Sequence, residues 1–526
     1  MLDGSPSRPL REPAAPPSLA RTPAGAADAL VGAALSLLAL ALYARTAPAV
    51  VNLDGLGYVK LLPHNFAAGH LLYMPLLRLA TALRHGDGLA AGRALSAVAG
   101  ALSVGLAFVC ARALLSRGAA ALAAAGLAVS YAAWVEGADV EVYSLALAAL
   151  LATFALALAY RRAPSTSGAA AVGVALGVAV LAHLTHVMAT PFVAAFLLAH
   201  ARSRRRGIAH AALACGTGGA LAIAAYAWAA LVVRRLSPEA ALAWIATAGH
   251  GFRYQGGPLA RLADSTYGLA KAFVWSPYLY ESNAQRLLGQ FLLGLLAASL
   301  LVGIVVARRR ALASLPLLPL LLWIASYAAM ALAFFGSDHE RWLFVLPPLW
   351  LLAAAALVDG DPRPRRPRQW TAPLAAALVG LLALANAVTA IGPAMRDTWD
   401  RTRADDAARV MADGDLVIFP GHSWDEYIGF YERRDLRPLP LAYYAGILGK
   451  DRCLARVERE VAEARRRGAH VWAVRLDDTD DTRGFWELGT LGLSRAELSR
   501  FLARFRLEPV PTVEPKVVVW RLEPRN

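Results

Sequence analysis

The chain has 526 residues, of which 57% are hydrophobic and 17% are charged. Soluble domains contain roughly 45–50% apolar and about 25% charged residues, so this composition, with a mean hydropathy of +0.45, excludes an ordinary soluble enzyme. The apolar residues form runs of about twenty, which is long enough to cross a membrane as an α-helix. The three cysteines show neither a disulfide pattern nor metal-ligand spacing, which excludes a secreted disulfide-rich protein.

The net charge of +15 comes almost entirely from arginine. Many arginines stand in short clusters between apolar runs: Arg161 and Arg162; Arg202, Arg204, Arg205 and Arg206; Arg308, Arg309 and Arg310; Arg363, Arg365, Arg366 and Arg368. This spacing is typical of the cytoplasmic loops of a multi-pass membrane protein. Because the basic residues do not form one stripe, we expect no nucleic-acid partner.

Residues 1–25 are rich in Pro, Ala and Arg without periodicity, which predicts a disordered cytoplasmic tail. A transmembrane domain of about eleven helices is expected over residues 26–393. The expected spans are 26–44, 89–111, 118–134, 141–160, 168–186, 187–201, 208–233, 287–307, 311–335, 342–358 and 370–393. The hairpin of the fifth and sixth spans is the weakest, since the sixth is short and contains Pro191, and a re-entrant or half-buried helix is an alternative.

The arginine clusters predict the orientation of this domain. All of them fall on the side of the N-terminus, whereas the opposite loops at 135–140 and 187–190 contain no Lys or Arg. With an odd number of spans, the N-terminus is expected in the cytoplasm and the C-terminus outside. The bias toward Ala and Arg suggests a bacterium, so we expect a multi-pass protein of the inner (plasma) membrane.

Residues 394–526 predict a separate extracytoplasmic α/β domain. Charged residues become frequent there, and segments 415–420, 470–476 and 517–522 have the pattern of buried strands. Helical patterns at 452–467 and 495–505 separate them, which predicts a small, partly parallel sheet. No Gly-rich phosphate loop is present, so a nucleotide site is not expected.

The first external loop contains a carboxylate close to the membrane boundary. Asp54 follows the first span closely and is flanked by glycine, which lets backbone or substrate approach. A carboxylate at this position suits a general base that deprotonates an acceptor hydroxyl, although a loop aspartate that caps a short helix is an equal alternative. We include Tyr58, at the end of the same stretch, among the substrate-binding candidates.

The loop between the third and fourth spans carries three acids, Glu136, Asp139 and Glu141. Like charges this close repel one another, so a cation, a divalent metal or a basic partner would stabilise them. No histidine lies at ligand spacing beside them, which weakens the metal interpretation. Glu141 also stands where it could complement the positive end of the next helix.

Two further candidates lie near the outer face. His183 and His186 are three residues apart near the end of the fifth span, on one face of an expected helix; they could bind phosphate oxygens, relay protons or simply pack. The loop before a late span contains His339 and Arg341. A guanidinium at the interface matches a phosphate, and the alternative is an interfacial anchor together with Trp342.

These motifs together resemble integral-membrane glycosyltransferases of the GT-C fold, related to the protein O-mannosyltransferase and aminoarabinose transferase superfamily. The resemblance rests on the acids of the first two external loops, the Glu-Val-Tyr-Ser-Leu stretch at 141–145, residues 177–191, and the Arg-Trp-x-x-x-x-Pro-Pro stretch at 341–348. It covers roughly residues 27–360. The acidic pair usual in the first loop is absent, because Gly55 follows Asp54.

The resemblance implies that the protein takes a sugar from a polyprenyl-phosphate donor in the membrane lipid and passes it to an acceptor hydroxyl of a protein, glycolipid or polysaccharide, with inversion. Asp54 would then be the base, Glu141 a second acid lining the cavity, and Arg341 with His183 or His186 would hold the lipid phosphate. No cofactor is certain, and a divalent metal is not excluded.

Two other classes of function stay open from the residues alone. A multi-pass transporter or flippase of a lipid-linked or polar solute is the first alternative, although no internal repeat is evident. A non-catalytic assembly factor is the second. An enzyme would bring Asp54, Glu141 and Arg341 together at the outer face, whereas a transporter would have polar groups through the membrane centre.

Overall fold

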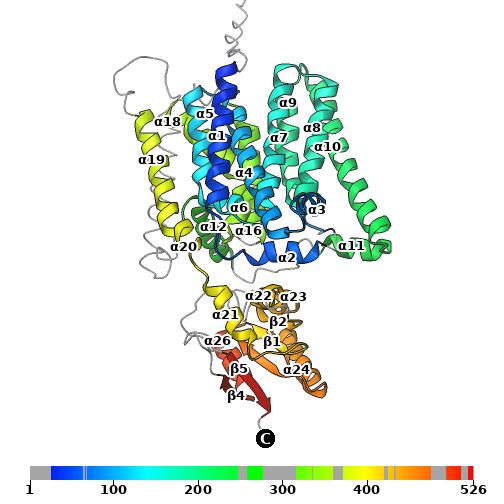
Figure 1. The fold of residues 1–526 in the computed structure, drawn as a ribbon. Helices are drawn as coiled ribbons and strands as arrows, with labels where there is room; N and C mark the ends of the chain where they lie inside the picture. Colours follow the sequence, from blue (N-terminus) through cyan, green and yellow to red (C-terminus); the bar gives the residue numbers. More distant parts are fainter. Residues whose placement is uncertain are drawn as a thin grey trace, which may run out of the picture.

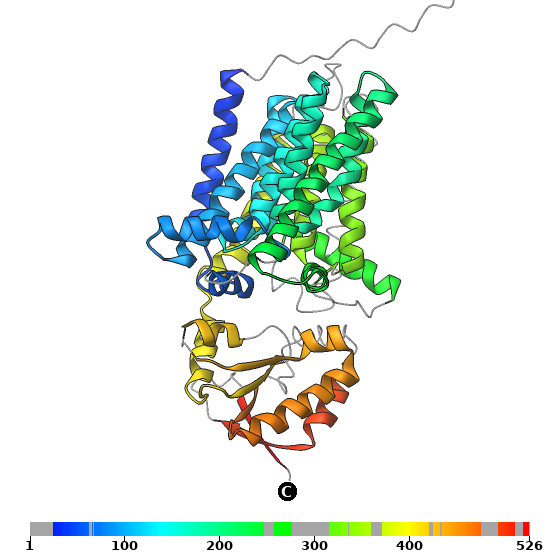
Figure 2. The same cartoon turned by 90° about the vertical axis from the view of Figure 1, so that its right-hand side faces the viewer.

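The computed structural model describes residues 25–62, 66, 68–246, 257–275, 315–334, 336–358, 371–419, 424–431, 434–474, 493–510 and 519–524. It has two parts: a bundle of long helices, and a small α/β domain that lies against one end of the bundle (Figure 1). The first helix begins at the far end of the bundle, and the chain finishes in the α/β domain (Figures 1 and 2). The predicted tail, except Gly25, and the predicted span 287–307 lie outside the described residues.

The long elements of the bundle follow the apolar runs of the sequence. They are α1 (Ala26–Arg45), α4 (Gly88–Arg112), α5 (Arg117–Val129), α6 (Tyr131–Ala138), α7 (Tyr143–Arg162), α8 (Thr166–Ala182), α9 (Thr190–His200), α10 (Arg204–Ala227), α16 (Leu317–Phe334), α18 (Leu346–Leu357) and α19 (Thr371–Asn386). A 3₁₀ turn at Leu184–Ala189 precedes α9, and π-helical turns at Trp228–Val233 and Ala387–Ile391 extend α10 and α19, the second leading into α20 (Gly392–Ala394).

Six helices in the described residues are long and apolar enough to cross a membrane, or seven if the bent pair α5 and α6 counts as one span. The predicted span 118–134 is thus broken, with a bend of 61° between its two helices. The break is at Ser130, whose backbone is extended and whose hydroxyl donates to the carbonyl of Gly126 at 2.7 Å. The helices α8, α9 and α18 are shorter than a full span, so the count of eleven remains a prediction.

Close helix packing in the bundle depends on small residues, as is common between membrane helices. Helices α8 and α10 cross where Gly173 faces Ala214. A Cβ at Gly173 would lie 2.5 Å from the carbonyl oxygen of Ala214, and one at Gly218 would lie 2.8 Å from the carbonyl oxygen of Gly173. Larger residues at these two positions would therefore force the helices apart.

Five shorter helices lie toward the end of the bundle that faces the α/β domain. They are α2 (Leu53–Leu61), α3 (Tyr73–Leu83), α11 (Pro238–Ala246), α12 (Pro258–Phe273) and α17 (His339–Leu343). Figure 1 labels four of them, and the fifth, α17, packs against α12 and α6. The turns that join α4 to α5, α7 to α8 and α9 to α10 lie at the opposite end, with the start of α1 (Figure 1). At that end Asp28 pairs with Arg112 at 3.0 Å and Arg117 at 2.5 Å. The two ends of the bundle are therefore chemically different.

The C-terminal domain contains a five-stranded mixed sheet with strand order β2-β1-β3-β5-β4. Its elements are α21 (Trp399–Ala408), β1 (Leu416–Phe419), α22 (Trp424–Tyr431), β2 (Arg437–Pro440), α23 (Leu441–Leu448), α24 (Lys450–Arg466), β3 (Val471–Val474), α26 (Arg495–Leu502), β4 (Phe505–Val510) and β5 (Val519–Pro524). Strands β2, β1 and β3 are parallel, and β5 is antiparallel to both β3 and β4. The predicted partly parallel sheet is confirmed.

Strands β2 and β4 were not predicted. Both lie at the edges of the sheet, where proline is tolerated because one side of the strand needs no ladder partner. Strand β2 contains Pro438 and Pro440, and β4 contains Pro509, so neither resembles a regular strand in sequence. The helix predicted over 495–505 ends at Leu502, and Phe505 begins β4.

The two faces of the sheet bury different cores. Leu416 and Ile418 pack with the apolar faces of α23, α24 and α26. Their neighbours Val417 and Phe419 point to the other face, as alternation in a strand requires. That second core includes α21 and α22, and it also includes Val51, Leu56 and Val140 from the loops of the bundle. The domain is thus joined to the end of the bundle that carries α2 by a shared hydrophobic core.

Candidate active site

Helix α2 brings the first acidic residue to the end of the bundle nearest the C-terminal domain (Figure 1). Asn52 caps this helix, since its Oδ1 accepts a hydrogen bond from the backbone N–H of Gly55 at 2.6 Å. Asp54 lies in the first turn, where the helix end favours a negative charge. A Cβ at Gly55 would lie 2.7 Å from the carbonyl oxygen of Val140, so glycine allows α2 to press against the second acidic loop.

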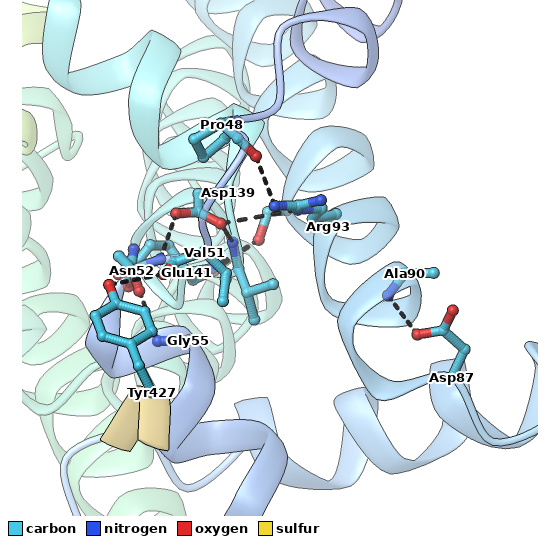
Figure 3. A network of polar contacts seen from close by, with 12 residues as sticks. Pro48, Val51, Asn52, Gly55, Asp87, Ala90, Arg93, Asp139, Glu141 and Tyr427 are labelled. Atoms are coloured by element: carbon cyan, nitrogen blue, oxygen red, sulfur yellow. Dashed lines mark hydrogen bonds and ion pairs between the residues drawn. The ribbon is translucent and has the colours of Figure 1, made fainter. Parts of the chain in front are cut away.

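Asn52 links α2 to that loop (Figure 3). Its backbone N–H donates to Oδ2 of Asp139 at 2.9 Å, and its side-chain Nδ2 donates to Oε1 of Glu141. Arg93 on α4 lies 3.9 Å from Oδ1 of Asp139 and donates to the carbonyl of Pro48 at 2.7 Å. Asp139 is thus occupied in tying the loops together, and we assign it a structural contact in place of the expected contact with substrate.

Burial raises the pKa of Asp139 to about 6, although hydrogen bonds from the Asn52 and Val140 backbone and the charge of Arg93 oppose the shift. A folded-state pKa above the unfolded value means that this group favours folding at low pH and that the contribution is lost as pH rises through about 6. Above that pH, the buried charge of Asp139 lowers the free energy of unfolding by about 3 kcal/mol.

We therefore expect Asp139→Asn to unfold at a higher temperature than the unmodified protein at pH 7.5, with a difference that shrinks as pH falls toward 4.5. The asparagine oxygen still accepts from the Asn52 N–H but carries no charge to bury. Thermal unfolding of the purified protein across this pH range measures the difference, with the exposed Asp87→Asn as control. Parallel pH profiles for the variant and the unmodified protein would contradict the assignment.

Three carboxylates converge beside α2. Asp54, Glu141 and Glu340 each offer an oxygen, and the three oxygens lie within 4.8 Å of one another. Asp54 is exposed, whereas Glu141 is 2% exposed. Burial, together with the neighbouring acids, raises the pKa of Glu141 well above its usual value. Burial and Asp338 raise the pKa of Glu340 to about 8, with the charge of Arg341 opposing. Such a group would be stabilised by a shared proton or by a bound cation.

A carboxylate–imidazole pair lies next to this group. Nε2 of His339 is 3.1 Å from Oε1 of Glu136, and with Glu340 these side chains form a second set whose ligand atoms lie within 4.8 Å. Burial lowers the pKa of His339 to about 3, with Lys271 acting in the same direction, so the neutral imidazole is the dominant form. Oxygen and imidazole donors around the shared Glu340 are compatible with a divalent cation, which stays a proposal.

Aromatic and basic side chains line the other side of the acids. Arg341 donates to the hydroxyl of Tyr143 at 3.1 Å, with its guanidinium 5.9 Å from the ring centre. The ring of His183 lies 5.2 Å from that of Tyr143 and 4.6 Å from that of His70, and the ring of Tyr58 lies 5.9 Å from that of His70. These five side chains form a continuous row, which we call the aromatic row.

In this row, Nε2 of His183 has no hydrogen-bond partner within the described parts of the chain. Nε of Arg341 makes no hydrogen bond there either, but it lies 3.7 Å from Oδ2 of Asp338. Arg341 is also surrounded by acids. Its burial lowers the pKa of the guanidinium, but Tyr143, Asp338, Glu340 and Asp54 raise it more strongly, so the net shift is upward. The guanidinium therefore stays charged.

The two expected histidines do not share one helical face. Helix α8 ends at Ala182, His183 is extended, and His186 lies in the following 3₁₀ turn. The turn begins where Nδ1 of His183 lies 2.7 Å from the hydroxyl of Thr185. His186 is fully buried, and its ring nitrogens lie 2.6 Å from the hydroxyl of Tyr327 and 2.9 Å from the carbonyl of Ala146. His183 therefore joins the aromatic row, and we leave His186 out of the proposed site.

Sequence reasoning missed Glu340, His70 and Tyr143. Glu340 and Tyr143 stand inside stretches that the sequence had already singled out, beside Arg341 and Glu141, but no spacing rule distinguishes them from their neighbours. His70 stands in the segment between α2 and α3 without a motif. The three side chains come from α17, α7 and the segment before α3. Only the structure shows that these elements lie close together.

The comparisons with known proteins agree with this architecture. The family model of dolichyl-phosphate-mannose-protein mannosyltransferases matches residues 71–232. No curated protein matches the chain. ArnT from Cupriavidus metallidurans bound to undecaprenyl phosphate is similar over 94% of this chain and 97% of that chain, with a TM-score of 0.55 and 15% identity.

Two structures of an archaeal enzyme from Archaeoglobus fulgidus are also similar. The oligosaccharyltransferase tethered to an acceptor peptide has a TM-score of 0.51 at 12% identity, over 95% of this chain and 74% of that one. The oligosaccharyltransferase AglB with an inhibitory peptide and a dolichol-phosphate has a TM-score of 0.50 at 12% identity, over 91% of this chain and 72% of that one. The predicted GT-C fold is confirmed.

Proposed function

We propose, on the premise that the chain has the GT-C fold of membrane glycosyltransferases, that it transfers a sugar from a polyprenyl-phosphate donor to an acceptor hydroxyl. The observation that carries this proposal is the meeting of Asp54, Glu141 and Glu340 with the aromatic row that ends at Arg341. One side of the site can remove a proton, and the other can hold a phosphate. The undecaprenyl phosphate and dolichol-phosphate in the similar structures support a lipid phosphate as the leaving group.

Asp54 is the base in this proposal. It is the exposed member of the three carboxylates, so an incoming hydroxyl can reach it. The acceptor oxygen attacks the anomeric carbon of the sugar, its proton passes to Asp54, and the bond between that carbon and the phosphate oxygen breaks. The electron pair leaves with the lipid phosphate. This direct displacement inverts the anomeric centre, and it needs no nucleotide because the phosphate ester is already activated.

Arg341 and His183 stabilise the phosphate as it leaves. A positive guanidinium next to developing negative charge lowers the barrier of the transfer step. Nε2 of His183, which has no hydrogen-bond partner among the described residues, provides a hydrogen bond. Tyr58 lies on the same row and can contact the sugar or the phosphate. The pair formed by Glu136 on α6 and His339 on α17 lies next to the three carboxylates.

The test is transfer by the purified protein. We expect incubation with radiolabelled polyprenyl-phosphate sugars and crude cell-envelope acceptors to move label from one donor into an acceptor, with inversion. The same reaction after EDTA treatment, and after addition of Mn²⁺ or Mg²⁺, decides whether a divalent cation acts at the acids. Absence of transfer from every polyprenyl-phosphate donor tested would refute the proposal.

The membrane orientation is part of the proposal. The arginine clusters at 161–162 and 202–206 lie at turns at the end of the bundle opposite the acids and the C-terminal domain (Figure 1), whereas those at 308–310 and 363–368 lie outside the described residues. The described clusters support a cytoplasmic N-terminus and an external active site under the positive-inside rule. In a bacterial inner membrane, alkaline phosphatase fused after Asn526 is expected to be active in intact cells, and a fluorescent protein fused at the same place is expected to be dark. The reverse result would place the site in the cytoplasm.

A transporter is less well supported than an enzyme. Among the described residues, Glu136, Asp139 and Glu141 gather at the end of the bundle that faces the C-terminal domain, and Asp28 is neutralised by arginines at the other end. A transport path would need polar groups through the centre of the membrane. The arrangement of acids at one face favours chemistry there.

A further inference from the structure

Glu141 is held at its backbone and at its carboxylate by different elements. The hydroxyl of Ser96 on α4 accepts from the Glu141 N–H at 3.0 Å and donates to its carbonyl at 3.0 Å. These bonds fix the backbone but leave the direction of the side chain undetermined. The carboxylate oxygen Oε2 accepts from the N–H of the adjacent Val142 at 3.3 Å, and Oε1 accepts from Nδ2 of Asn52. Of these two contacts, only Asn52 comes from another element, so it ties the direction of the carboxylate to α2.

Asn52 can do this because an amide is both donor and acceptor. Its Oδ1 caps α2 through Gly55, and its Nδ2 reaches Glu141 (Figure 3). Aspartate could cap the helix equally well but would place a second carboxylate against Glu141. Serine could also cap it, but its short side chain carries no N–H directed at Glu141. Among helix-capping residues, asparagine suits both contacts.

The peptide bond before Asn52 is held from two sides. The Val51 carbonyl accepts a buried hydrogen bond from the hydroxyl of Tyr427 at 3.0 Å, and the Asn52 N–H donates to Asp139. Tyr427 belongs to α22 of the C-terminal domain, and Val140 packs in the same core. The start of α2 is thus clamped between the acidic loop and the C-terminal domain (Figure 3).

We propose that Asn52 is a positioning residue that sets the carboxylate of Glu141 against Asp54, and that Tyr427 holds Asn52 in place from the C-terminal domain. This inference rests on the proposed transfer reaction. It assigns the C-terminal domain a role in the geometry of the active site, through one hydrogen bond to Val51, which precedes the helix that carries the base. Neither Asn52 nor Tyr427 touches the reacting atoms.

The experiment compares kcat and donor KM for the purified full-length protein and its variants. Asn52→Asp is expected to lower kcat about 100-fold, as a misplacement of about 1 Å can do, with little change in donor KM. Asn52→Ser removes the donor without adding charge and is expected to lower kcat less. Tyr427→Phe is expected to lower kcat several-fold, again with little effect on KM.

Matched controls separate positioning from general damage. Asp87→Ser changes the cap of the neighbouring helix α4, where Asp87 accepts from Ala90 at 2.9 Å (Figure 3), and Tyr444→Phe removes a hydroxyl elsewhere in the C-terminal domain. Both are expected to keep kcat within about twofold, which is a difference of about 0.4 kcal/mol. A normal kcat in Asn52→Asp, a loss confined to KM, or an equal loss in Asp87→Ser would overturn the inference.

Hydrogen–deuterium exchange gives a readout that does not depend on the reaction. In Asn52→Asp, peptides covering residues 53–61 and 139–142 are expected to exchange faster, whereas Asp87→Ser is expected to leave both peptides unchanged, because serine also caps a helix start. Unchanged exchange in both peptides would refute the clamp. If the unmodified protein shows no transfer, the proposed function fails, and the exchange data still decide whether Asn52 ties α2 to the acidic loop.

Discussion

Replacing Asp54 with asparagine is expected to abolish sugar transfer and to leave the protein folded. Asparagine has nearly the same shape but cannot accept the proton of the incoming hydroxyl, and loss of a general base typically costs about 10²–10⁴ in rate. The fold depends little on this charge, because Asp54 is exposed. A charge near a helix start contributes only about 0.3–1 kcal/mol at such positions. Initial rates of transfer at saturating donor measure the effect.

A control for this result is Asp87→Asn, which changes another exposed aspartate near the start of a helix at the same end of the bundle. Gel filtration and thermal unfolding of both variants should match the unmodified protein. Transfer at an undiminished rate in folded Asp54→Asn would remove Asp54 from the mechanism. The base would then have to be sought in Glu141 or Glu340, the other two members of the acid group.

Replacing Arg341 with alanine is expected to weaken use of the lipid donor. The guanidinium remains charged, and its Nε makes no hydrogen bond within the described residues, although it lies 3.7 Å from Asp338. Hydrogen bonds to charged groups contribute about 1.5–3 kcal/mol, so donor KM should rise roughly ten- to one-hundred-fold, with a further fall in kcat because the leaving phosphate also loses its cation. Arg341→Lys keeps the charge without the planar fork. Its donor KM should lie between those of the unmodified protein and Arg341→Ala. Steady-state kinetics with varied donor concentration provide the measurement.

The alternative for this residue is an interfacial anchor shared with Trp342. The indole N–H of Trp342 donates to the carbonyl of Gly336 at 2.8 Å, so Trp342→Phe removes an anchoring contact without touching the aromatic row. If Arg341 acts on the phosphate, donor KM rises in Arg341→Ala and not in Trp342→Phe. Equal donor dependence in Arg341→Ala and the unmodified protein would show that Arg341 is only an anchor.

The three acids at 136–141 show how far a local pattern can be interpreted. Their number and spacing correctly indicated that something must compensate like charges, but not which residue uses which partner. Asp139 is compensated by backbone N–H groups and Arg93, Glu136 by His339, and Glu141 by Asn52. The partner His339 is about two hundred residues away in sequence, which is why no histidine was found at ligand spacing.

The sequence by itself determined the broad architecture of this protein. Runs of apolar residues determine helices in a membrane because an unpaired backbone cannot remain in hydrocarbon, and the composition change after residue 394 marks the α/β domain. Asp54, the acids at 136–141 and the stretch at 341–348 were visible as motifs. These features depend on local composition and period, so they can be recognised without knowledge of contacts.

Only the tertiary structure decided which of these residues meet. Glu340 joins Asp54 and Glu141, and His70 and Tyr143 complete the row between Tyr58 and Arg341, because four separate segments converge at one end of the bundle. The tertiary structure also determined where helices end. Helix α8 ends at Ala182, and His183 caps the 3₁₀ turn that follows. Contacts of this kind depend on side-chain packing between segments far apart in the chain, and no local periodicity encodes them.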